Sequence, residues 1–212
     1  MSAYFGQQHM KTVSQILIAV ALVGAFVVPS IMAQQQTIRL HGAIETLDGH
    51  TLLVRSRDDA ELKLTLADKL LVVEVVKASM ADIKEGAFIG SGAIPQPDGS
   101  QKAIEVHIFA ESMRGTGEGF RPWDGTPNST MTNGSVGTTV TGVDGPVISV
   151  KYKDGEKKIV VTPDVPIVRY EVSNISALKP GASFSVNAAV KKADGTFDVG
   201  RVNVGRDGVV PN

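Results

Sequence analysis

Apolar and polar residues alternate along much of the chain, with the two-residue period that is typical of half-buried β-strands. The stretch 61–66 reads ELKLTL, so leucine alternates there with more polar residues. Residues 70–76 form a mainly apolar run rich in valine, which is typical of a buried strand. Aspartate–glycine pairs at 48–49 and 98–99 are tight-turn signals between such stretches. The pattern predicts an all-β protein.

The same landmarks occur a second time about 96 residues later. A fixed offset over this length indicates an internal repeat, which decides how the whole fold is interpreted. Gly86 and Gly181 are 95 residues apart, which predicts one extra residue, a bulge, in the fourth main strand of the second copy. The landmarks with an offset of 96 are Asp48-Gly49 and Asp144-Gly145, Asp68 and Asp164, Asp98-Gly99 and Asp194-Gly195, and Val106 and Val202.

Each copy predicts three strands, an extended apolar segment, a short helix or turn, and two further strands. Five strands with a helical insert between the third and the fourth are the plan of the OB barrel. Gly42, inside the first strand, suits the sharp bend of a closed barrel. We therefore expect two tandem OB-like barrels of five to six strands, with a pair of open antiparallel sandwiches as the alternative. The expected parts are barrels at 37–110 and 137–206, a Gly/Pro-rich connecting segment at 111–136 and a C-terminal tail at 207–212.

The first 33 residues have the three parts of a secretory signal peptide. Lys11 precedes an apolar run at 16–28, and Ala33 is a small residue suited to cleavage. The run is 13 residues long, shorter than the roughly 20 of a membrane span. We expect a signal peptide at 1–33, translated from Met1 or Met10, and a periplasmic or secreted bacterial protein without a stable membrane span. An uncleaved anchor is the alternative.

The formal charge narrows the class of partner. The chain has 21 Lys and Arg against 22 Asp and Glu, and loss of Lys11 with the signal peptide leaves 20 against 22, or −2. Tight nucleic-acid binding depends on neutralising phosphates with basic residues, so nucleic acid is not an expected partner. The absence of cysteine excludes disulfides and thiolate chemistry.

The motifs do not predict a reaction. The sequence has no G-x-S-x-G elbow. Glycines at 115, 117 and 119 are followed by Phe120 and Pro122, whereas a dinucleotide fingerprint needs G-x-G-x-x-G at the start of a helix. We therefore expect a protein that is not an enzyme and has no cofactor.

The connecting segment is the most distinctive stretch, because it holds the only tryptophan. Aromatic and arginine side chains are enriched at interaction hot spots. We therefore expect this segment to bind an envelope protein or peptide. We also expect the segment to be ordered, with Trp123 buried against one or both barrels. The alternatives are a flexible linker and a structural clasp in which Trp123 only holds the barrels together. The candidate partner-binding residues are Arg114, Phe120, Arg121 and Trp123.

Histidines raise one alternative function. His41 lies on the first strand and His107 on the last strand of the first module, so the two could approach in a barrel. Zinc and copper sites need three or four convergent ligands, and the second copy has Asn203 where the first has His107. We predict no metal site and retain His41 and His107 as the alternative ligands.

Three motifs carry a resemblance to a known family. They are G-x-I-x-x-x-D-G-x-x-L-x-V from Gly42, D-I-K-E-G-x-x-I-x-x-x-A from Asp82 and D-G-x-x-x-A-x-E-V from Asp98. The chain resembles a bacterial family of exported, OB-like β domains of unknown function, and stretches 113–119 and 201–208 are similar to its two-copy alphaproteobacterial members. The motifs are turns and core positions, so the resemblance implies a fold and no chemistry. Similar chains sometimes carry the label metal transporter permease, which implies, as an alternative, a periplasmic metal-handling protein associated with metal transport.

Overall fold

The structure, a computed structural model, describes residues 37–123, 125–143 and 145–212. The expected signal peptide at 1–33 lies outside the described residues. No helix in the described part of the chain is long and apolar enough to cross a membrane. Regular structure in that part is almost entirely β, as predicted, and the short helix or turn expected near 79–86 is the 3-10 turn η1 (Met80–Asp82).

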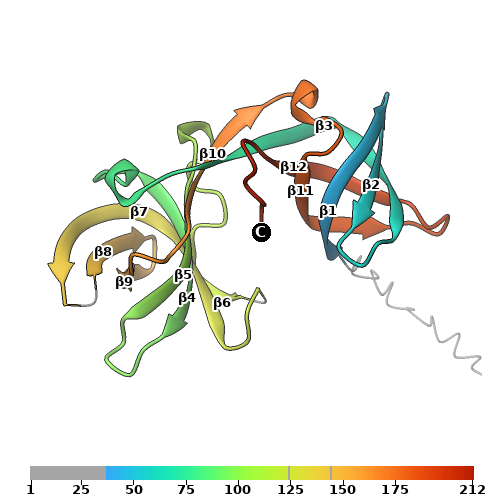
Figure 1. The fold of residues 1–212 in the computed structure, drawn as a ribbon. Helices are drawn as coiled ribbons and strands as arrows, with labels where there is room; N and C mark the ends of the chain where they lie inside the picture. Colours follow the sequence, from blue (N-terminus) through green and yellow to red (C-terminus); the bar gives the residue numbers. More distant parts are fainter. Residues whose placement is uncertain (1–36, 124, 144) are drawn as a thin grey trace, which may run out of the picture. The chain divides into compact units, whose positions relative to one another are not determined.

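Twelve strands and three 3-10 turns make up the described fold (Figure 1). The strands are β1 (Thr37–Asp48), β2 (Thr51–Ser56), β3 (Glu61–Lys77), β4 (Phe88–Pro95), β5 (Gln101–Ile108), β6 (Gly119–Trp123), β7 (Ser129–Gly142), β8 (Gly145–Tyr152), β9 (Gly155–Val160), β10 (Ile167–Ser173), β11 (Ser183–Lys191) and β12 (Phe197–Gly205). The other two 3-10 turns are η2 (Glu111–Met113) and η3 (Ile175–Ala177).

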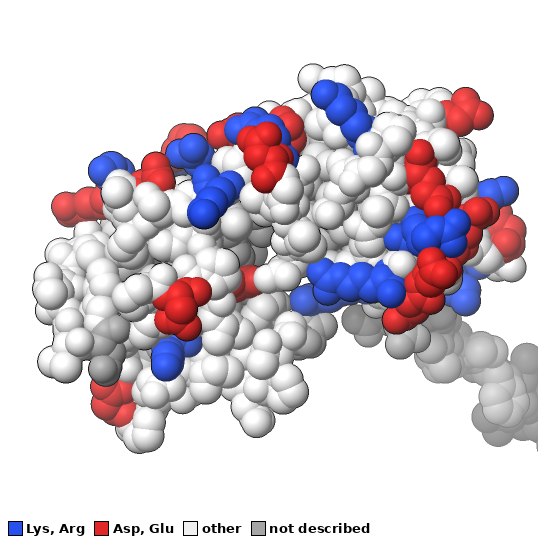
Figure 2. All heavy atoms as spheres, viewed as in Figure 1, with Lys and Arg blue, Asp and Glu red and all other residues white. Residues whose placement is uncertain are grey.

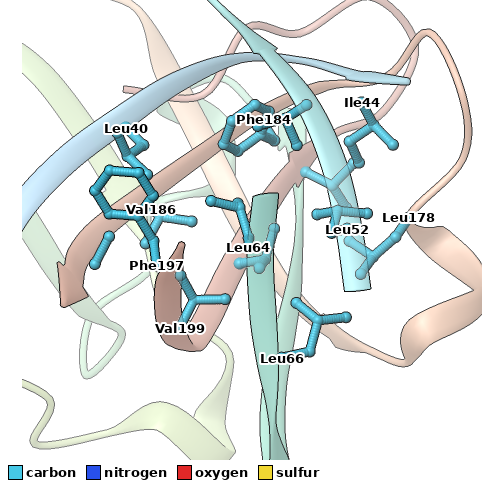
Figure 3. Packing of buried hydrophobic residues seen from close by; sticks show 14 of the residues in the cluster. Leu40, Ile44, Leu52, Leu64, Leu66, Leu178, Phe184, Val186, Phe197 and Val199 are labelled. Atoms are coloured by element: carbon cyan, nitrogen blue, oxygen red, sulfur yellow. The ribbon is translucent and has the colours of Figure 1, made fainter. Parts of the chain in front are cut away.

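Five strands close into a barrel, in the order β1-β2-β3-β12-β11 and back to β1. The β3–β12 pairing is parallel and the other four are antiparallel. Alternate residues of these strands point inward and fill the barrel with an apolar core, since burial removes that surface from water. Figure 3 shows this core, with Leu64 among Leu52, Phe184, Val186 and Phe197.

Five other strands pair in the same cyclic order, β7-β8-β9-β5-β4 and back to β7. We call these five strands the second ring, and the closed barrel is the first ring. Here the parallel pairing is β5–β9, through two residue pairs, and β6 adds to the outer edge of β7. A separate apolar cluster, which includes Ile89, Val106, Ile148 and Ile159, packs between these strands.

Each ring takes three consecutive strands from one half of the chain and two from the other. The sequence pattern led us to expect the strands of each module to close on themselves, yet β4 and β5 pair with β7 and β9 rather than with β1 and β3. The apolar run at 70–76 explains this difference. It lengthens β3, which pairs with β12 as far as Val75 on one edge and with β10 from Val72 to Lys77 on the other, so the chain reaches the second ring before β4 begins (Figure 1).

Equivalent turns in the two halves have the same local chemistry. Ser100 N–H donates to Asp98 Oδ1 at 2.9 Å, and Thr196 N–H donates to Asp194 Oδ1 at 3.0 Å. The glycines that follow the two aspartates both have φ of +85°, the left-handed conformation that glycine adopts without strain. The bulge predicted in the fourth strand of the second copy is confirmed in β11. Two steps along β1, from Leu40 to Ile38, match three along β11, from Val186 to Ala189.

Candidate functional site

A cleft of about 310 Å³ lies between the barrel and the second ring. A larger hollow of about 750 Å³, around 77–80 and 161–168, is lined mostly by apolar residues. We take the cleft as the candidate site because charged, aromatic and amide side chains converge on it, which is typical of sites that orient a ligand. The cleft is lined by Arg39, Glu105, His107, Arg121, Trp123, Asn133, Tyr170, Arg201 and Asn212, among others.

The floor of the cleft is a stack of three side chains from three strands. The His107 ring of β5 stacks on the Tyr170 ring of β10, with 4.9 Å between centroids and 14° between planes. The Arg201 guanidinium of β12 lies over the Tyr170 ring, 5.4 Å from its centroid. A cation over an aromatic face is attracted by the ring quadrupole, so Tyr170 holds Arg201 in place.

Burial decides the charge of this stack. Desolvation, with smaller contributions from Arg201 and Arg121, lowers the pKa of His107 to about 3, so the ring is neutral at neutral pH. Glu105 Oε1 is 3.7 Å from His107 Nδ1, and because the imidazole is neutral this contact is not an ion pair. Burial also raises the pKa of Glu105, against the hydrogen bond from Asn212, and raises that of Tyr170 to about 12.

A chain of hydrogen bonds connects the two rings through the C-terminal stretch. Asn212 Nδ2 donates to Glu105 Oε2 at 2.7 Å, and Ser185 Oγ donates to Asn212 O at 3.1 Å. Asn203 Nδ2 donates in turn to Ser185 Oγ, and Arg201 Nε donates to Asn203 Oδ1 at 2.8 Å. The network fixes Glu105 and Arg201 at opposite ends of one polar path.

Two guanidinium groups at the cleft have no described carboxylate within ion-pairing distance. Arg201 is half-buried and makes only the Asn203 hydrogen bond and the Tyr170 contact given above. Burial lowers the pKa of Arg201, because removal from water disfavours its charged form. Arg121 is exposed and donates from Nη1 to Gly117 O at 2.7 Å. The cleft therefore presents cationic groups that the described protein leaves without counter-charge.

Trp123 forms one wall of the cleft. Its indole is half-buried and lies against Gly92 and Gly125, where an added Cβ would come within 2.5 Å and 2.2 Å of ring atoms. The Arg39 guanidinium of β1 lies 6.0 Å from the ring centroid, on the other ring's side of the cleft. Trp123 is therefore packed between backbone of one ring and a cation of the other.

The connecting segment is structured, since β6 pairs with β7 from Gly119–Asn133 to Trp123–Ser129. Of the four predicted partner-binding residues, the structure brings Arg121 and Trp123 to the cleft and leaves two outside it. Arg114 binds Glu111, Ser135 Oγ and Gly86 O. Phe120 is 39% exposed, with Lys157 Nζ 4.3 Å from its ring centroid.

The two alternative metal ligands have other surroundings. His107 belongs to the stack, and His41 has a buried Nδ1 without a hydrogen-bond partner in the described structure. Desolvation, followed by Arg57, lowers the pKa of His41. Within the described ranges, no group of three or more His, Asp or Glu residues is placed to hold a metal ion.

Sequence reasoning missed Glu105, Tyr170 and Arg201. A signal for two of them was present, because Glu105 and Arg201 differ by the repeat offset of 96 and so occupy matching places on β5 and β12. Glu105 lies on β5 and Arg201 on β12, the strands that make the parallel pairing in each ring. Opposite charges at such matching places indicate a shared polar site. Tyr170 had no such signal, because its role depends on the pairing of β10.

Charge on the surrounding surface is mixed. Figure 2 shows basic and acidic side chains in small neighbouring groups on the face it presents.

Family models, curated proteins and solved structures were each compared with the chain, and none of them matched.

Proposed function

We propose that the chain is an exported, non-enzymatic binding or assembly protein of the bacterial cell envelope, and that its partner occupies the cleft. In this proposal residues 1–33 are a cleaved signal peptide, and the protein is periplasmic or secreted. The two rings are OB-type barrels, each assembled from both copies of a tandem repeat. The family resemblance and the strand order β1-β2-β3-β12-β11 support the OB interpretation.

The observation that carries the proposal is the pair of guanidiniums, Arg121 and Arg201, beside the Trp123 wall. A half-buried cation without a counter-charge costs free energy, and a bound anion would remove part of that cost. Arginine and tryptophan are also the residues most enriched at interaction hot spots. An envelope protein or peptide with complementary charge is therefore the proposed partner.

A pull-down from envelope extract tests this proposal. The bait variants are the wild type, an Arg121→Ala plus Trp123→Ala double variant, and Arg114→Ala as a control outside the cleft. We expect one partner to be retained by the wild type and by Arg114→Ala and to be lost with the double variant, after circular dichroism shows that all three are folded. Equal capture by all three would contradict a role for the cleft.

A further inference from the structure

The charged groups of the cleft define which kind of ligand it can bind. The Arg201 and Arg121 guanidiniums line the cleft together with His107, and they are the two cations that lower the pKa of His107 after desolvation. Arg201 has its Nη atoms unused by the described protein, and Arg121 uses Nη1 only for Gly117 O. A guanidinium offers its remaining N–H groups as a planar fork that matches a carboxylate.

A second observation specifies a hydrogen-bond donor on the ligand. Asn133 is 4% exposed, and its Nδ2 donates to Thr116 O at 3.0 Å. Its Oδ1 is buried and accepts no hydrogen bond within the described structure. A buried acceptor without a donor costs free energy, because it has lost its hydrogen bonds to water. Oδ1 lies over Gly90 on the same side as His107 Nε2, because a Cβ added at Gly90 would come within 2.7 Å and 2.1 Å of these two atoms. A ligand with an N–H that enters beside Gly90 would satisfy this acceptor, and its carboxylate would satisfy the guanidiniums.

Two backbone carbonyls at this cleft already accept hydrogen bonds from side chains. Asn133 holds the carbonyl of Thr116, and Ser185 holds the carbonyl of Asn212, which is 96 residues further on. Strand β6, which carries Arg121 and Trp123, pairs with β7 on one edge and has no described partner on the other. An unpaired strand edge is a template for an added extended peptide.

We propose that the cleft binds an extended acidic peptide segment of a partner protein, whose carboxylate is held by Arg121 and Arg201 and whose backbone N–H donates to Asn133 Oδ1. This inference rests on the proposed function. Trp123 and Arg39 flank the segment, and β6, which lines the cleft from Arg121 to Trp123, has one edge without a described partner.

A fluorescence titration tests the proposal, because Trp123 is the only tryptophan and reports on the cleft alone. The probe is a five-residue peptide, capped at both ends, with a central glutamate flanked by valines. Its matched control replaces glutamate with glutamine, which keeps the shape and removes the charge. N-acetylglutamate separates a free acidic amino acid from a peptide.

We expect the glutamate peptide to change Trp123 emission saturably, and the glutamine peptide and N-acetylglutamate to bind at least tenfold more weakly. Arg121→Gln and Arg201→Gln should each weaken glutamate-peptide binding at least tenfold. Arg201→Lys, which keeps the charge, guards against loss of folding and should retain part of the affinity. The exposed Arg57→Gln, outside the cleft, should bind as the wild type does.

Three outcomes would overturn the inference. Equal binding of the glutamate and glutamine peptides would show that the cleft does not recognise the carboxylate. Equal binding of N-acetylglutamate and the glutamate peptide would show that the ligand is a small acid rather than a peptide. Absence of binding by all three probes, with an envelope partner still lost from the cleft double variant, would reject the acidic peptide and leave the proposed function standing. If that partner is absent as well, both proposals fail.

Discussion

Glycines around Trp123 show how single residues shape the cleft. Gly92 and Gly125 lie where any side chain would enter the indole ring, so the position of Trp123 depends on two missing Cβ atoms. Gly200, on β12, is different, because an added Cβ there meets nothing within 4 Å. Gly92 and Gly200 therefore provide a matched test of how tightly Trp123 is packed.

Gly92→Ala should destabilise the protein by about 1–3 kcal/mol, the usual cost of overpacking, and shift Trp123 emission to longer wavelength as the ring is displaced. Gly200→Ala should do neither. Urea unfolding followed by tryptophan emission measures both effects. Unchanged stability and emission in Gly92→Ala would show that Trp123 is not held against this strand.

His107 should make the protein sensitive to acid. The pKa of His107 is about 3 in the folded chain, against an ordinary value of 6.5. Between these two pH values the imidazole is therefore protonated in the unfolded chain and neutral in the folded chain. Stability from this residue is therefore lost as the pH falls from about 6.5 towards 3, by about 2 kcal/mol at pH 5. The raised pKa of Glu105 acts in the opposite direction, because the folded chain then binds that proton more readily.

The variant that isolates this effect is His107→Asn, since the matching place on β12 is Asn203. We expect the difference in unfolding free energy between pH 7 and pH 5 to be about 2 kcal/mol smaller in His107→Asn than in the wild type. Urea unfolding at the two pH values measures it. Equal differences in the two proteins would mean that His107 is not held neutral by burial.

Strand elements were the part of the fold that the sequence predicted well. Alternation at 61–66, the aspartate–glycine turns at 48–49, 98–99 and 194–195 and the single extra residue of β11 all depend on local chemistry that a pattern carries. The turn expected at 144–145 includes residue 144, which lies outside the described residues. The choice of neighbouring strand did not follow, because alternation sets which face of a strand is buried and not which strand lies beside it. The cleft depends on that choice, so only Arg121 and Trp123 of its main residues were predicted as partner-binding residues, and His107 was named for a different role, as an alternative metal ligand.

The exchange of strands can be tested with disulfides, because the chain has no cysteine of its own. Thr65 on β3 pairs with Asp198 on β12. Had each half closed on itself, the partner of Thr65 would instead be Lys102, 96 residues before Asp198. We expect Thr65→Cys plus Asp198→Cys to form a disulfide on mild oxidation, and Thr65→Cys plus Lys102→Cys to remain reduced. Thiol labelling and mobility on a non-reducing gel distinguish them, and the reverse result would restore two self-contained modules.

At the scale of the molecule, β3 and β10 pair residues that are connected by the 96-residue shift found in the sequence. Val75 lies opposite Tyr170 and Glu74 opposite Glu171, so the 96-residue shift maps each of these pairs onto the other. Glu105 and Arg201 follow the same relation, and their opposite charges make the cleft asymmetric. The cleft therefore has two chemically different ends, one at Glu105 and one at Arg201.

The shared strands also determine how such a chain can change over time. A duplicated domain whose copies fold separately can let one copy drift while the other keeps the original role. Here a substitution on β5 alters a ring completed by β7, β8 and β9, and one on β12 alters the ring completed by β1, β2 and β3. Under the proposed tandem repeat, selection therefore acts on the two copies together, and neither can be lost or replaced without unmaking both rings.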